Sequence, residues 1–184
     1  MRKIDVVVLH HSASENATVE AIRRYHMHRR GMSDIFYHYL IDRTGVLHTG
    51  RSEEQPSTRR RPTAIEVCVL GSLHKTPINL LQHETLLDLL DSIYSSFGHI
   101  PVKGHNDFSN TICPASLDVD FYHRYLQIER RKDSMTWKKE IIELAEKRGI
   151  IMTGVHEAEE VAEKWFVLAV LMNALDKKGG NGNV

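Results

Sequence analysis

The sequence predicts an α/β layer fold over roughly its first 130 residues, followed by a smaller helical segment. Short runs of β-branched and aromatic residues alternate with longer segments of helical periodicity, which is typical of this class. Apolar residues make up 41% of the 184 residues and charged residues 26%, as in globular proteins. This composition excludes a disordered, collagen-like or low-complexity chain, and the length suits one ordinary domain with a modest appendage.

The expected strands are short, and they occupy residues 4–9, 35–41, 46–48, 64–70 and 100–103. The segment 42–45, Asp-Arg-Thr-Gly, is typical of a turn and joins the second strand to the third as a hairpin. A polar loop, 50–63, leads to the fourth strand.

Three helices are expected beside these strands. Thr18 can cap the first, which ends at Gly31. Asn79 and Gln82 resemble a capping pair for the second, whose leucine-rich stripe runs up to Gly98. The third helix closes the domain at 118–129.

The charge pattern excludes several function classes. The chain carries 24 Lys plus Arg and 24 Asp plus Glu, so its formal charge is zero and nothing indicates nucleic-acid binding. The apolar run 165–172 is much shorter than the roughly 20 residues of a membrane span. Asp5 and His10 interrupt the apolar start of the chain, so we expect a soluble protein made without a secretion signal.

Twelve histidines are the unusual feature of the composition. His10 stands at the carboxyl end of the first expected strand, and His105 and Cys113 lie eight residues apart in one loop. Two imidazoles and one thiolate form a three-ligand zinc set that leaves a fourth position for water. Three protein ligands indicate a catalytic site, because structural zinc usually takes four.

The surrounding motifs occur in a recognisable order. They are VLHHSAS at 8–14, YHYLIDRTG at 37–45, AIEVCVLG at 64–71, and later Gly104-His105 and Cys113-Pro114. As an ordered set they are specific. The sequence resembles the type-2 N-acetylmuramoyl-L-alanine amidases, which include phage lysozyme-type amidases and peptidoglycan recognition proteins, from residue 4 to about residue 126.

This resemblance implies a central mixed β-sheet flanked by helices. It implies that His10, His105 and Cys113 hold Zn²⁺, that Tyr37 is catalytic by orienting water or stabilising the oxyanion, and that Thr111 lies near the substrate. The implied reaction is hydrolysis of the amide bond between N-acetylmuramic acid and L-alanine in peptidoglycan.

Glu66 is a departure, since the family more often has glycine at this position. Alternation along the strand puts Glu66, Cys68 and Leu70 on one face, which in one branch carries a catalytic glutamate at the position of Leu70. A carboxylate buried here would be costly unless it is paired or takes part in proton transfer. The favoured alternative is that Glu66 lies at a solvated strand end and pairs with an arginine of 59–61.

Most other histidines are expected to have no functional role. His11 and His38 alternate away from the site and are expected to pack, His26 is expected in the core, and Cys68 is expected to be an inert interior thiol. Solvated positions are expected for the arginine run 59–61, which could also touch a carboxylated stem peptide, and for His28, His48, His74, His83, His99, His123 and His156.

A charged hinge at 129–133 indicates a boundary between an amidase domain, 1–132, and a helical C-terminal segment, 133–184. Two helical patterns, 135–148 and 157–177, carry apolar stripes that could cover each other or the first domain. The segment faintly resembles the helical wall-binding modules of endolysins. Cell-wall binding or self-association through 134–177 is therefore the competing interpretation.

The most direct functional expectation is a phage or prophage endolysin that stays in the cytoplasm until it is released and then acts on the cell wall. The loop 55–62 is shorter than in many members of the family, which alters the wall of the substrate groove. A non-catalytic peptidoglycan-binding module is therefore the alternative.

Overall fold

The computed structural model describes residues 2–129. The predicted C-terminal segment 133–184, with its stripes and its boundary at 132, lies outside the described residues and stays a prediction. Within 2–129, no helix is long and apolar enough to cross a membrane.

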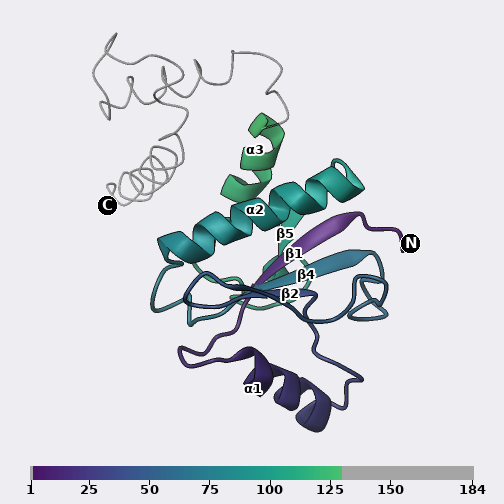
Figure 1. Ribbon diagram of the computed structural model, residues 1–184, viewed down its shortest axis with the longest axis vertical. Coiled ribbons are helices and arrows are strands. Elements are labelled where there is room, and N and C mark those ends of the chain that lie inside the picture. The colour runs from purple at the N-terminus through teal and green to yellow at the C-terminus, as the bar shows by residue number, and fades with distance from the viewer. Residues whose placement is uncertain (1, 130–184) are drawn as a thin grey trace. The chain divides into compact units, whose positions relative to one another are not determined.

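A five-stranded sheet forms the centre of the described chain, in the order β3-β2-β4-β1-β5 (Figure 1). Its strands are β1 (Val6–His11), β2 (Tyr39–Ile41), β3 (Leu47–Thr49), β4 (Ala64–Val69) and β5 (Val102–Gly104). Strand β1 pairs in parallel with β4 and β5, β2 pairs in parallel with β4, and only the β2–β3 hairpin is antiparallel. The sheet is therefore mixed, as the resemblance implied.

Strand β1 is the centre of the site as well as of the sheet. Its apolar run is fully buried from Val7 to Leu9, as expected for a strand with parallel neighbours on both sides and helices over both faces. Figure 1 shows α2 (Leu80–Phe97) on one side of the sheet and α1 (Val19–Arg24) on the other. Helix α3 (Val119–Glu129) lies on the α2 side.

The helix termini agree with the sequence signals. Thr18 Oγ1 accepts from the N–H of Ala21 at 3.2 Å, and Asn79 Oδ1 accepts from the N–H of Gln82 at 2.9 Å. Helix α2 ends at Gly98, whose φ of +78° is a conformation that glycine adopts without strain. The side chain of Gln82 is not part of the cap: its amide donates to the carbonyl of Leu70 at 2.8 Å.

The first helix changes its winding before it ends. After Arg24 the chain continues as a π-helical turn, Tyr25–Arg29, in which Arg30 N–H donates to the carbonyl of Tyr25 at 3.2 Å. This turn carries His26, whose Nδ1 accepts from the N–H of Phe36 at 3.1 Å. Within the predicted strand 35–41, β2 begins only at Tyr39, because Phe36 is bonded to this helix and Tyr37 to the loop at Arg51, although the N–H of His38 already donates to the carbonyl of Glu66 on β4.

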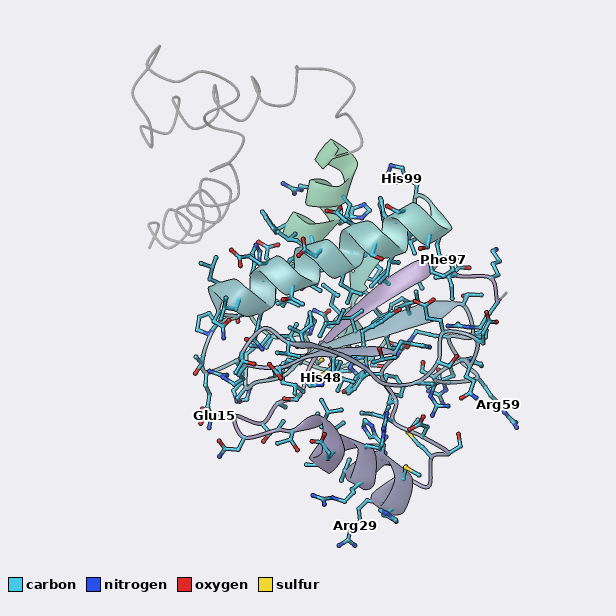
Figure 2. The ribbon with its side chains drawn as sticks, viewed as in Figure 1. Glu15, Arg29, His48, Arg59, Phe97 and His99 are labelled. Atoms are coloured by element: carbon cyan, nitrogen blue, oxygen red, sulfur yellow. The ribbon has the colours of Figure 1, made fainter. Side chains whose placement is uncertain are left out.

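One histidine that was predicted to be solvated is buried. His83 is buried on α2, and its Nδ1 is hydrogen-bonded to the hydroxyl of Tyr122 on α3 at 2.6 Å. Burial lowers the pKa of His83 to about 4. The exposed positions predicted for His99 and Arg59 are confirmed, and Figure 2 shows both side chains projecting from the surface.

Candidate active site

Three side chains from distant parts of the sequence meet at the carboxyl end of β1. The ligand atoms of His10, His105 and Cys113 all lie within 4.8 Å of one another. Cys113 Sγ is 3.7 Å from Nδ1 of His10, and both residues are buried. The structure thus brings together the three residues whose types and positions predicted a zinc set.

The sheet topology explains this convergence. Strands β1 and β5 are hydrogen-bonded parallel neighbours, so their carboxyl ends lie at the same edge. His10 is the last residue but one of β1. His105 directly follows β5 in a short 3₁₀ helix, His105–Asp107. The loop then folds back, with Asn106 N–H donating to the carbonyl of Cys113 at 2.8 Å.

The protonation states of this cluster suit a metal. Burial lowers the pKa of His10, and burial lowers the pKa of His105 to about 4, so both imidazoles are neutral near pH 7. Burial raises the pKa of the Cys113 thiol, although the N–H of His11 donates to its sulfur at 3.4 Å. A coordinated metal would deprotonate this thiol. Two neutral imidazoles and one thiol that lie close together, with His10 and Cys113 buried and His105 partly buried, fit zinc.

Tyr37 lies beside the cluster. Its ring centroid is 5.2 Å from that of His10, and burial raises its pKa well above the ordinary value, with Cys68 and Cys113 adding to the shift. The phenol therefore keeps its proton near neutral pH, and its hydroxyl is hydrogen-bonded to the side chain of Cys68. This placement is compatible with the predicted role at a developing oxyanion.

Thr111 is partly buried in the loop that carries two of the candidate ligands. Its hydroxyl oxygen accepts from the N–H of Cys113 at 3.2 Å. This contact supports the backbone of the Cys113 loop, and the predicted place of Thr111 near the substrate stays a prediction.

Glu66 is not at a solvated strand end. It is 0% exposed, with Oε2 2.7 Å from Nε2 of His10. Its other oxygen accepts from Arg61 Nε at 2.9 Å and from the hydroxyl of Ser57 at 3.1 Å. The expected arginine partner is present, but it too is mostly buried, so the solvated interpretation is wrong for both residues.

The charge of Glu66 follows from these contacts. Burial alone would raise its pKa, but hydrogen bonds from His10 and Arg61 hold the pKa below the ordinary value. The carboxylate is therefore ionised and paired with the guanidinium. Strand β4 has β1 on one side and β2 on the other, which places position 66 deep in the sheet.

The other predicted packing residues have backbone partners. His11 is buried, and its Nδ1 accepts from the N–H of Leu73 at 3.1 Å. His38 is buried, and its Nδ1 accepts from the N–H of Glu66 at 2.9 Å. Cys68 is fully buried in the core, as expected.

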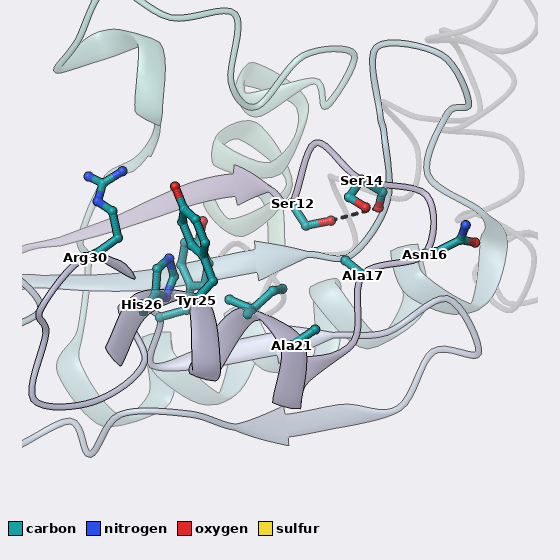
Figure 3. A pocket seen from close by; sticks show the side chains of 10 residues that line it. Ser12, Ser14, Asn16, Ala17, Ala21, Tyr25, His26 and Arg30 are labelled. Atoms are coloured by element: carbon teal, nitrogen blue, oxygen red, sulfur yellow. Dashed lines mark hydrogen bonds between the residues drawn. The ribbon is translucent and has the colours of Figure 1, made fainter. Parts of the chain in front are cut away.

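Two adjoining cavities flank Tyr37. One, of about 410 Å³, runs along α1, with Ser12 and Asn16 at one end and His26 and Arg30 at the other (Figure 3). The second, of about 360 Å³, is lined by His10 and His105 of the cluster and also by Met32, Phe36, Thr58, Arg60, Arg61 and Ser109. The two share Tyr37, His26 and Arg30 and so form one groove.

His26 and Arg30 were not predicted as site residues. His26 is only partly buried and lines the groove, so its predicted place in the core is wrong. The available signal was their spacing of four residues, which puts both side chains on one face of a helix.

The sequence is similar to those of known proteins. The sequence profile of the N-acetylmuramoyl-L-alanine amidase family matches residues 1–116. The chain is 27% identical over 122 residues to the endolysin of Escherichia phage T7, which covers 60% of this chain and 80% of the endolysin. It is also 27% identical over 129 residues to peptidoglycan-recognition protein SC1a of Drosophila melanogaster, which covers 61% of this chain and 69% of that protein.

A solved structure gives the same fold. The N-acetylmuramoyl-L-alanine amidase LysC from Clostridium intestinale URNW matches with a TM-score of 0.63 at 24% sequence identity, covering 68% of this chain and 87% of that one. The profile match spans well over half of the sequence and includes His10, His105 and Cys113. This chain therefore belongs to the N-acetylmuramoyl-L-alanine amidase family.

Proposed function

We propose that the chain is a zinc-dependent amidase that cleaves the bond between N-acetylmuramic acid and L-alanine in peptidoglycan. The observation that carries this proposal is the cluster of His10, His105 and Cys113 with Tyr37 beside it in a groove. Membership of the amidase family and similarity to phage endolysins support it.

His10, His105 and Cys113 would hold the metal. The chemistry that zinc supplies in a three-ligand site is polarisation of a carbonyl and activation of water near neutral pH. Tyr37 would donate its phenolic proton in a hydrogen bond to the oxygen on which negative charge develops. The ring of Tyr37 is already packed beside the cluster, so only its hydroxyl has to turn from Cys68 toward that oxygen.

The groove would position the substrate on both sides of Tyr37. Arg30 and Arg60 line it and are exposed, which suits the carboxylates of a stem peptide. The partner of this site is then peptidoglycan or a soluble muropeptide. We further propose the biological setting of an endolysin, cytoplasmic until its release and acting on the cell wall, in line with the endolysin relatives.

Binding without turnover is the second candidate. The similarity to a peptidoglycan-recognition protein, at the same 27% identity, favours it. Against it, the cluster here includes Cys113, and the non-catalytic members of the family that the sequence resembles typically lack that cysteine.

Mass spectrometry of digested cell walls separates the two candidates. An amidase releases peptides with a free L-alanine amino terminus and leaves glycan with intact muramic acid. Release should stop with a chelator and return with added zinc. Cell walls that bind the protein but yield no new alanine termini would establish the binding module instead.

A further inference from the structure

We propose that Glu66 is a positioning residue for the metal centre, and that its carboxylate fixes His10 with Nδ1 turned toward the other two ligands. This inference rests on the proposed zinc site, because His10 is one of its three candidate ligands. It gives Glu66 a role that the family resemblance does not imply.

The contact between the two residues fixes the orientation of the ring. His10 Nε2 lies 2.7 Å from Glu66 Oε2, and the side chains are 2% and 0% exposed. A carboxylate oxygen can only accept, so Nε2 carries the proton in this hydrogen bond. In the neutral ring the lone pair is then on Nδ1, and Nδ1 is the atom 3.7 Å from Cys113 Sγ.

The sheet register explains how Glu66 reaches His10. In the parallel pairing of β1 with β4, Val8 is opposite Glu66 and His10 is opposite Cys68. His10 and Glu66 therefore share one face of the sheet, offset by two residues. A glycine at position 66, which the family more often has, would leave this imidazole nitrogen without the carboxylate.

Glu66 is itself held in place. Arg61 Nε and the Ser57 hydroxyl both donate to Oε1, which leaves Oε2 for His10. A buried carboxylate without such partners would be strongly destabilising. All three groups therefore constrain the orientation of the carboxylate that His10 contacts.

Arg61 also reaches the loop that carries the other ligands. Its guanidinium carbon lies 5.0 Å from the ring centroid of Phe108, between His105 and Cys113 in sequence. Loop 55–62, which looked altered in the sequence, thus supplies Ser57 and Arg61 to a chain of contacts that ends at the metal cluster.

Zinc affinity measures this role directly. Loss of a hydrogen-bond partner of a ligating histidine typically costs about 10–100-fold in metal affinity. Competition with a chromophoric chelator should show this loss for Glu66→Ala. Glu66→Gln retains an oxygen acceptor and should lie between Glu66→Ala and the original protein. The absorption of the Co²⁺-loaded Glu66→Ala protein should also shift, because the ligand geometry is less constrained.

The chain offers a matched control. His48 Nε2 lies 2.7 Å from Asp42 Oδ2, an equally short histidine–carboxylate contact in the β2–β3 hairpin, away from the cluster. Asp42→Asn should leave zinc affinity and the cobalt spectrum unchanged. If the loss of any histidine–carboxylate pair had the same general effect, zinc affinity would fall equally in the Glu66 and Asp42 variants.

A second variant is the control for effects of the substitution on folding. Glu66→Ala leaves Arg61 buried without its partner, whereas Glu66→Leu combined with Arg61→Leu removes both charges together. The double variant should show the same loss of zinc affinity. Folded variants that bind zinc within twofold of the original protein would overturn the inference. An original protein that binds no zinc would overturn the proposed function itself.

Discussion

The ring of Tyr37 lies 5.2 Å from the ring of His10, although β4 lies between β1, which carries His10, and β2, which begins at Tyr39. Tyr37 lies two residues before the start of β2, and its ring packs against the core cluster that contains Cys68. The placement of the phenol therefore depends on the backbone before β2 and on packing against this core cluster.

Tyr37→Phe tests the phenol as a donor. The rate should fall roughly 10²–10³-fold, the usual effect of losing one oxyanion donor, because the ring remains and only the hydroxyl is lost. Zinc content, measured by elemental analysis, should stay at its original stoichiometry. A fall in zinc content that parallels the fall in rate would assign Tyr37 a structural role instead.

Gly50→Ala tests the backbone that places Tyr37. A Cβ at Gly50 would overlap the carbonyl oxygen of Tyr37 and press against Ile35 and Leu40. We expect a loss of unfolding free energy of about 1–3 kcal/mol from overpacking, together with a lower rate. Denaturant unfolding and turnover would measure the two effects.

Gly98→Ala is the control for that substitution. Its φ of +78° strains an alanine, but a Cβ there meets no atom within 4 Å. Stability should fall, while the rate per folded molecule stays constant. Equal kinetic losses in the two variants would mean that the displacement of Tyr37 is not the cause.

Cys113→Ser should remove zinc and abolish turnover while the fold is retained. A serine hydroxyl stays protonated near neutral pH and is a poor substitute for a thiolate ligand. The matched variant is Cys68→Ala, which loses a fully buried sulfur from the core and should lower stability but keep zinc. Full activity in Cys113→Ser would end the metal-amidase interpretation.

Acid should destabilise the protein through His83. Its pKa is lowered by burial to about 4, against roughly 6.5 in the unfolded chain, so below pH 6.5 the unfolded state binds the proton first. The contribution of neutral His83 to the free energy of unfolding is therefore fully present above pH 6.5. It is lost as the pH drops toward 4, by up to ~3 kcal/mol.

His83→Asn should reduce this dependence on pH. Its side-chain oxygen can still accept from the hydroxyl of Tyr122, but it takes up no proton in this range. Urea unfolding at pH 7 and pH 5 should show a smaller difference than in the original protein. An identical difference would assign the acid sensitivity to other buried histidines.

Truncation tests the C-terminal segment. A chain ending at Asp133 keeps the whole of α3 and should hydrolyse soluble muropeptides at the original rate. If 134–177 binds the cell wall, the shortened chain should sediment poorly with intact walls. Unchanged binding would reduce the segment to a packing role, and analytical ultracentrifugation of both chains would test self-association.

Local signals predicted much of the fold. The caps at Thr18 and Asn79 and the hairpin turn at 42–45 depend on neighbours in sequence, and all three are confirmed. The convergence of His10 with His105 was predictable too, because both follow or end strands of an expected α/β layer and parallel strands share an edge.

The misplaced residues depend on partners that are remote in sequence. The sequence predicts that Glu66 pairs with an arginine of 59–61, but not that the pair is buried, because the contact with His10 comes from 56 residues away. His83 was assigned to solvent because its burial depends on Tyr122, which belongs to another helix. Periodicity identifies the buried face of a helix but not how far a second helix extends that face.

The central position of β1 has a consequence for how the protein is made. His10 and Cys113 are 103 residues apart in sequence, and the strand that carries His10 precedes the other four strands of the sheet. The metal cluster cannot assemble on the ribosome before Cys113 has emerged, and parallel pairing over such separations is slow. Zinc uptake would therefore be a late event in biogenesis, and a partly synthesised chain would have no hydrolytic capacity inside the cell that produces it.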